Sequence, residues 1–225
     1  MARLTLKPTE KQNYILLGGD LVKRLELART RESEGDFEGA CNIRFHACQE
    51  IVEVLPEEEQ VELDASHANT AAAMDIIHGS AVDNFLAGDA ELAAAQLELL
   101  LECDSEDHTG ATPQLALCYI ALGEWECLAE IIPDIDEKSP MHALVNAWLT
   151  FAEQGDMGAA IERLRRHTAL AAELRATEHP ADEQFLADIA SERPSAAAQA
   201  RELYLRCEPL FVQSPDFVAW LRDNL

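Results

Sequence analysis

Polar and apolar residues follow one another along most of the chain with the three- to four-residue spacing of amphipathic α-helices. Alanine, leucine and glutamate, which are good helix formers, dominate the composition. Segments in which β-branched residues alternate with polar ones, the usual sign of a half-buried strand, do not stand out in the sequence. The pattern therefore predicts an all-α protein.

A short motif, glycine followed by an acidic residue, recurs between the amphipathic segments. The four copies are Gly35-Asp36, Gly88-Asp89, Gly123-Glu124 and Gly155-Asp156. Glycine readily adopts the left-handed conformation that ends one helix, and an acid is favourable at the positive N-terminal end of the next. Successive glycines are 53, 35 and 32 residues apart. The last two spacings are close to a helix-hairpin repeat of about 34 residues.

The longer first spacing leaves room for one more helix. Pro56 and the glutamates that follow it are typical of a helix start, so we expect a helix from about Glu57 to Leu86, with a break near Gly79 left open. Further helices are expected at residues 181–190 and 195–206 and after Ser214. A stack of hairpins needs such terminal helices to cover its last apolar face, so residues of about 180–225 are interpreted as capping helices.

Several residues stand at the positions of a known helical repeat. In the segment from about residue 109 to 140 these are Ala116 and Tyr119 in the first helix, Gly123 and Trp125 at the turn, and Pro140 at the close. In the next segment they are Phe151, Gly155 and Ala160. On these residues, the chain resembles the tetratricopeptide repeat (TPR) superfamily over about residues 20–170. It is also similar to divergent bacterial TPR-like proteins that have no assigned activity.

This resemblance implies a fold and a mode of action. The fold would be a single domain over residues 1–225, a right-handed solenoid of about five helical hairpins. TPR domains are binding scaffolds in which side chains of the first helix of each hairpin line a concave groove. Carried over to this chain, the candidate groove residues are Asp75, His78, Phe85, Leu86, His142 and Glu153.

The charge distribution is the most unusual feature of the sequence. The chain carries 42 acidic and 17 basic residues, for a net charge of −25. Residues 45–137 contain no lysine or arginine but 22 acids. This charge disfavours a nucleic-acid ligand, because phosphate binding depends on basic side chains. Two explanations stay open, a surface that serves solubility or a salty cytosol, and an acidic surface for a basic partner.

The sequence carries no recognisable catalytic or metal-binding motif. The six cysteines form no CxxC pair, His67 and His78 are too far apart along a helix to share one metal ion, and no signal-peptide core or membrane-length apolar run is seen. We therefore expect a cytoplasmic protein with reduced cysteines, no metal and no cofactor. Asp107 and His108 suggest acid–base chemistry, but acids in such a position are more typical of helix caps.

These observations lead to a functional hypothesis with two alternatives. We expect a non-catalytic scaffold or adaptor that binds a basic segment of a partner protein through its acidic centre, with no nucleic acid or membrane involved. The first alternative is a secretion-type or assembly chaperone. The second is an enzyme with an unrecognised Asp/His site. The oligomeric state is left open.

Overall fold

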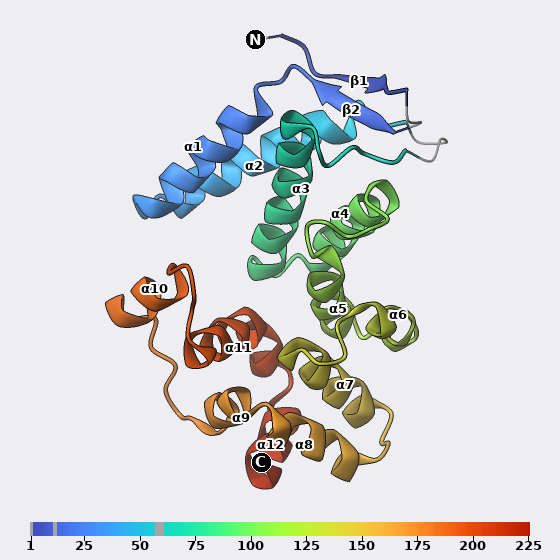
Figure 1. Cartoon of the computed structure of the whole chain (residues 1–225). Helices are drawn as coiled ribbons and strands as arrows, with labels where there is room; N and C mark the ends of the chain where they lie inside the picture. The colour runs from blue at the N-terminus through green and yellow to red at the C-terminus, as the bar shows by residue number, and fades with distance from the viewer. Residues whose placement is uncertain (1, 11–12, 57–60) are drawn as a thin grey trace. The chain divides into compact units, whose positions relative to one another are not determined.

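The protein is mostly helical. The computed structural model describes residues 2–10, 13–56 and 61–225, and within them it contains twelve α-helices and one two-stranded β-sheet (Figure 1). The contacts divide the chain into two compact units, Met1–Cys118 and Tyr119–Leu225. None of the described helices is long and apolar enough to cross a membrane. The helical class predicted from the sequence is confirmed, while the two strands were not expected.

The first unit contains the sheet and four complete helices. These elements are β1 (Thr5–Pro8), β2 (Tyr14–Leu17), α1 (Leu21–Ser33), α2 (Phe37–Val52), α3 (Ala68–Leu86) and α4 (Ala90–Cys103). Each helix packs on the next, and α1 also contacts α3. The division between the units falls within α5 (Ala111–Leu122).

The second unit is helical throughout. Its elements are α6 (Trp125–Ile131), the short 3-10 helix η1 (Ile132–Asp134), α7 (Pro140–Ala152), α8 (Met157–Arg166), α9 (Thr168–Arg175), α10 (Glu183–Ile189), α11 (Ala196–Gln213) and α12 (Pro215–Asn224). Its core is built around Trp148 of α7, whose ring stacks on Phe211 of α11 and Phe217 of α12. Because Phe217 is fully buried there, the C-terminal helix packs within its own unit.

All four glycine–acid motifs lie between two helices, as predicted. Gly35, Gly88 and Gly123 have φ values of 81°, 90° and 73°, in the left-handed region that favours glycine. At the fourth turn the left-handed residue is Gln154 (φ 55°), one position earlier than expected. There the N–H groups of Gln154 and Gly155 donate to the carbonyls of Phe151 and Thr150, the bond pair that ends a helix in a Schellman motif.

The acids that follow three of these turns cap the next helix. The side chain of Asp36 accepts a hydrogen bond from the N–H of Gly39, and Asp89 and Asp156 accept equivalent bonds at the start of α4 and α8. Each carboxylate satisfies one of the N–H groups that the first helical turn leaves without a partner. Glu124 also occupies the capping position of its helix but its side chain makes no such bond.

The expected helix from Glu57 begins later than predicted. Residues 57–60 lie outside the described residues, and residues 61–67 are not helical, so α3 begins at Ala68. The reason is pairing with the sheet, because the N–H of Tyr14 donates to the carbonyl of Glu62 and the N–H of Asp64 donates to the carbonyl of Tyr14. The buried N–H of Leu16 donates to the Thr70 hydroxyl at 2.9 Å, which fixes β2 against the start of α3.

Helix α3 runs through Gly79 without a break. A Cβ atom at Gly79 would lie 2.7 Å from Cδ of Arg44, which crosses α3 at this point. The glycine therefore provides space for a side chain of α2 and does not interrupt the helix.

Candidate binding surfaces

Four of the predicted groove residues lie on α3, in the first unit. Asp75 is exposed and pairs with Arg29 of α1, whose Nη2 atom lies 3.2 Å from Oδ2. His78 is half-buried. Phe85 is only 3% exposed and belongs to the core, so its side chain is not available to a ligand, whereas Leu86 beside it is 54% exposed. Of the four, Leu86 offers the most accessible apolar surface.

The other two predicted groove residues lie in the second unit. Glu153 is the exposed residue that ends α7. His142 lies in the first turn of the same helix and lines a cavity of about 590 Å3. The cavity wall also includes Lys138, Arg163 and Arg166. His142 therefore lies among basic side chains, and its surroundings differ from the acidic groove expected from the sequence.

Arginines from outside the base-free stretch neutralise part of its charge. Three of its acids pair with arginines of α1 and α2. The pairs are Arg24–Glu50 at 2.8 Å, Arg29–Asp75 at 3.2 Å and Arg44–Asp83 at 2.7 Å. The charges of these three acids on α2 and α3 are thus balanced within the first unit. The acids of α4 therefore contribute more of the uncompensated negative charge of this unit.

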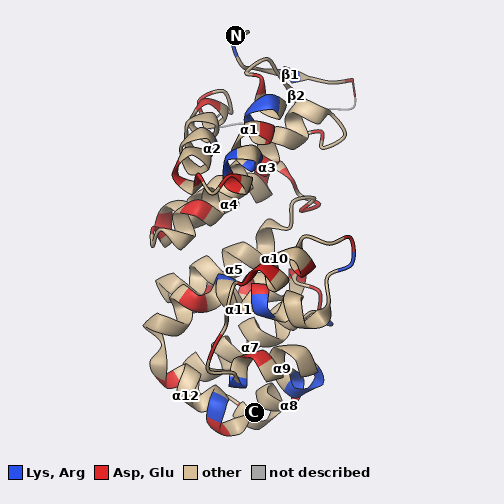
Figure 2. Ribbon diagram, turned by 90° about the vertical axis from the view of Figure 1, so that its left-hand side faces the viewer, with Lys and Arg blue, Asp and Glu red and all other residues tan. Residues whose placement is uncertain are grey.

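Helix α4 carries a row of exposed acids. Glu91, Glu98 and Glu102 are all exposed and are spaced seven and four residues apart, which places them on one face of the helix. No ion pair of Glu91 or Glu102 with lysine or arginine occurs among the described residues. Figure 2 shows acidic but no basic residues along α4. We call this row, together with the exposed Leu86 at the end of α3 and the exposed Leu92 in the first turn of α4, the α4 acidic face.

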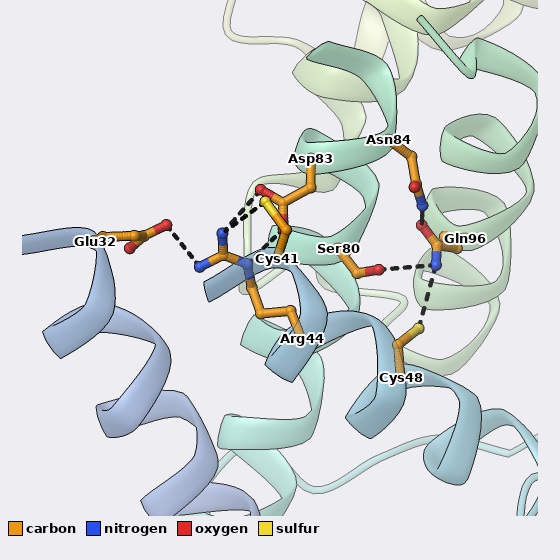
Figure 3. Close-up of polar contacts among 8 residues, drawn as sticks. All are labelled: Glu32, Cys41, Arg44, Cys48, Ser80, Asp83, Asn84 and Gln96. Atoms are coloured by element: carbon orange, nitrogen blue, oxygen red, sulfur yellow. Dashed lines mark hydrogen bonds and ion pairs between the residues drawn. The ribbon is translucent and has the colours of Figure 1, made fainter. Parts of the chain in front are cut away.

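A polar network centred on the buried Arg44 joins α1, α2 and α3 (Figure 3). The guanidinium of Arg44 donates two hydrogen bonds to Asp83, from Nε at 2.7 Å and from Nη2 at 2.8 Å, and its Nη1 atom pairs with Glu32 at 2.6 Å. Burial alone would lower the pKa of Arg44, but the hydrogen bonds and charges of Asp83 and Glu32 outweigh it and raise the pKa. The side chain therefore stays charged and clamps three helices together.

A second polar group extends the network to α4. Gln96 donates through Nε2 to Ser80 at 3.1 Å and to the Cys48 sulfur at 3.3 Å, and its Oε1 atom accepts from Asn84 at 2.8 Å (Figure 3). The buried amide is thereby satisfied at both ends. These contacts fix the register of α2, α3 and α4.

The Asp/His region has a structural role that the geometry accounts for. Asp107 caps α5, since its carboxylate accepts hydrogen bonds from the N–H groups of Ala111 and Thr112 at 2.5 and 3.1 Å. Nδ1 of His108 lies 2.6 Å from Oδ1 of the buried Asp104, whose carboxylate accepts the hydrogen bond. This hydrogen bond and the charge of Asp104 raise the pKa of His108. His108 also borders an open cavity of about 480 Å3. The cap interpretation of Asp107 is confirmed.

The cysteines behave as small apolar residues. All six are free thiols, and Cys48, Cys103, Cys118 and Cys207 are buried. Burial raises the pKa of Cys103 to about 11 and the pKa of Cys118 and of Cys207 to about 12. A thiol with such a pKa is rarely ionised and is a poor nucleophile and metal ligand. Among the described residues, no group of three or more histidine, cysteine, aspartate or glutamate side chains is arranged to hold a metal ion.

Comparisons of the chain with protein-family models, with curated proteins and with solved structures found no match in any of the three.

Proposed function

We propose that the protein is a non-catalytic binding module that holds a basic, partly apolar segment of a partner protein on its α4 acidic face. The observation that carries the proposal is the row of Glu91, Glu98 and Glu102 on a helix without a single lysine or arginine. Like charges on one face repel one another and destabilise the isolated helix by a few tenths of a kcal/mol per pair. A basic partner would relieve this repulsion.

The exposed leucines of the α4 acidic face indicate which residues the partner segment contains in addition to basic ones. Leu86 is 54% exposed and Leu92 is 38% exposed, at the end of α3 and the start of α4. A lysine or arginine side chain can place its charged end on a carboxylate and its aliphatic stem on a leucine. The surface thus suits a segment in which basic and apolar residues are mixed.

The packing of the first helices supports the TPR-like arrangement as part of this proposal. Helix α1 pairs with α2 across the Gly35 turn, α3 pairs with α4 across the Gly88 turn, and α3 contacts both helices of the preceding pair. Successive hairpins in which each first helix packs on the previous hairpin are the building principle of helical repeat proteins. We therefore interpret the fold as a helical-hairpin solenoid, the architecture expected from the sequence.

A binding assay with a matched control tests the proposal. The probe is a fluorescent 12-residue peptide that alternates lysine with leucine, titrated with the protein at salt concentrations from about 50 to 300 mM. The test variant replaces Glu91, Glu98 and Glu102 with glutamine. The control replaces Glu178, Glu192 and Glu208, which are exposed acids of the second unit, so both variants lose the same charge.

The proposal predicts that the test variant binds the peptide at least about tenfold more weakly at low salt, because each carboxylate contributes roughly 1 kcal/mol at contact distance. The control should bind like the unmodified protein. Binding that ignores salt, or that weakens equally in both variants, would show that the α4 acidic face is not the site.

A further inference from the structure

The second unit holds a basic cavity in a strongly acidic protein. The cavity has a volume of about 590 Å3, which is within the usual range for small-molecule sites. Its wall includes Lys138, His142, Asn146, Arg163, Arg166 and His167. Glu137 is the one acidic residue in the wall. Three permanently charged bases and two imidazoles thus surround the space, against one carboxylate.

A structural explanation accounts for only part of this cluster. Basic residues at the end of α8 are favourable because the C-terminal end of a helix is negative, and Arg163, Arg165 and Arg166 all lie in its last turn. Arg165, however, pairs with Glu162 and donates to the carbonyl of Asn224, and it does not line the cavity. The negative end of the α8 dipole therefore does not explain why Arg163, Arg166 and Lys138 line the same cavity.

The charges in the cavity are largely uncompensated. Arg163 donates from Nη1 to the Oδ1 atom of Asn146 at 2.9 Å, a neutral acceptor. Lys138 and Arg166 form no ion pair with any residue in the described ranges. In a chain with 42 acidic residues, two exposed bases in the wall of one cavity without a carboxylate partner indicate space that an external anion can fill.

The two histidines also converge on the cavity from different helices. His142 lies in the first turn of α7, and His167 is the residue between α8 and α9. The pKa of His167 is lowered by its burial and, secondarily, by the nearby His142. The two rings are thus close enough to affect each other's charge, and an anion between them would favour protonation of both.

We propose that this cavity binds a phosphate group, either as the free ion or as the ester of a small organic molecule. A phosphate carries nearly two negative charges and accepts hydrogen bonds in several directions, which suits bases that approach from the segment before α7, from α8 and from the α8–α9 junction. A carboxylate has one charge and two oxygens in a plane, so it would leave part of this cluster unpaired. The proposal is independent of the function proposed for the α4 acidic face, which lies in the other unit.

Titration calorimetry with defined anions tests the proposal. The protein is titrated with inorganic phosphate, glycerol phosphate, citrate and a short peptide with a free C-terminal carboxylate, all at one ionic strength set with sodium chloride. Arg166→Gln and Lys138→Gln are the test variants, and Arg193→Gln, an exposed arginine of the same unit, is the control. Circular dichroism checks that each variant is folded.

Saturable binding of phosphate or glycerol phosphate is expected, weakened about tenfold in Arg166→Gln and in Lys138→Gln and unchanged in Arg193→Gln. Tighter binding of glycerol phosphate would identify an organic phosphate as the ligand, and equal binding would identify the free ion. The absence of saturable phosphate binding, equal loss in all three variants, or tighter binding of citrate or the peptide would overturn the proposal.

A pH series adds a readout specific to the histidines. Sulfate is the probe here, because its charge stays constant between pH 8 and pH 5.5. Protonation of His167 as the pH falls should strengthen sulfate binding; the other charged or titratable groups that face the cavity are Glu137, Lys138, His142, Arg163 and Arg166. The effect should disappear in the double variant His142→Gln/His167→Gln. Sulfate binding that is equal at both pH values would contradict the assignment of the histidines to the site.

Discussion

Loss of the ion pair between Arg44 and Asp83 should destabilise the first unit strongly. The Arg44 side chain is 8% exposed and the Asp83 side chain is 18% exposed, and two hydrogen bonds of 2.7 and 2.8 Å join them. The substitution Arg44→Met keeps a long side chain that fills much of the same space. It leaves the Asp83 carboxylate without its main partner in a place that admits little water.

The size of the effect follows from this burial. Removal of one partner from a fully buried ion pair costs about 3–5 kcal/mol. Asp83 keeps some contact with water, which places the expected cost at the lower end. Glu32 is more exposed and its pair with Arg44 adds at most about 1 kcal/mol. We therefore expect Arg44→Met to lower the free energy of unfolding by about 3 kcal/mol.

Urea denaturation followed by far-ultraviolet circular dichroism measures this change. The control is Arg31→Met, because Arg31 pairs with Glu34 and Asp36 at longer distances of 4.0 and 3.4 Å and nearer to solvent, and it should cost less than about 0.5 kcal/mol. Addition of Asp83→Leu to Arg44→Met should recover much of the loss, since no buried charge then remains unpaired. A loss below about 1 kcal/mol in Arg44→Met, or no recovery in the double variant, would refute the reasoning.

Three further substitutions test other parts of the fold. Gly79→Ala should lower the free energy of unfolding by about 1–3 kcal/mol, and with it the urea midpoint, because the new methyl group would lie 2.7 Å from Cδ of Arg44. An unchanged midpoint would show that Arg44 moves aside without cost. Gln154→Gly should raise the free energy of unfolding by about 1 kcal/mol, and with it the melting temperature, because Gln154 has a φ of 55°, which is costly for residues other than glycine. Gly155→Ala is the comparison, at a position without positive φ. Burial alone would raise the pKa of Glu173, but the hydrogen bonds from Arg201 and His179 outweigh it, and the pKa lies below its usual 4.5. The ionised carboxylate stabilises the fold, and this contribution is lost as the pH falls through the lowered pKa. Melting temperatures measured from pH 6 to pH 3 should therefore fall less steeply in Glu173→Gln than in the unmodified protein. Parallel curves for the two proteins would contradict this.

The local features of the fold could be predicted from the sequence, and those that depend on distant contacts could not. The four turns and the terminal helices follow from glycine, proline and capping acids, whose effects act within a few residues. The strand Tyr14–Leu17 is too short to give a clear pattern, and it is held by the start of α3, more than 50 residues away. The same pairing keeps residues 61–67 out of the helix that Pro56 and its neighbouring acids indicate.

The candidate binding surfaces also depend in part on contacts between residues that are far apart in the sequence. The base-free stretch includes the acids of α4, but the sequence does not show that Arg24, Arg29 and Arg44 neutralise acids of α2 and α3. The basic cavity was not found because Lys138 and Arg166 are 28 residues apart in a chain whose average charge is strongly negative. The TPR resemblance indicates His142 as a groove residue, but its basic neighbours come from the segment just before α7 and from the following helix, α8.

The most direct test of the central claim is to map where a basic segment contacts the protein. The lysine–leucine peptide is bound at low salt and joined to the protein with a carbodiimide, which links lysine amines to carboxylates without a spacer, and the linked residues are identified by mass spectrometry. The account predicts links at Glu91, Glu98 and Glu102 that disappear at high salt. Links that concentrate on the exposed Glu124, Glu126 and Glu130 of the second unit, with none on α4, would contradict it.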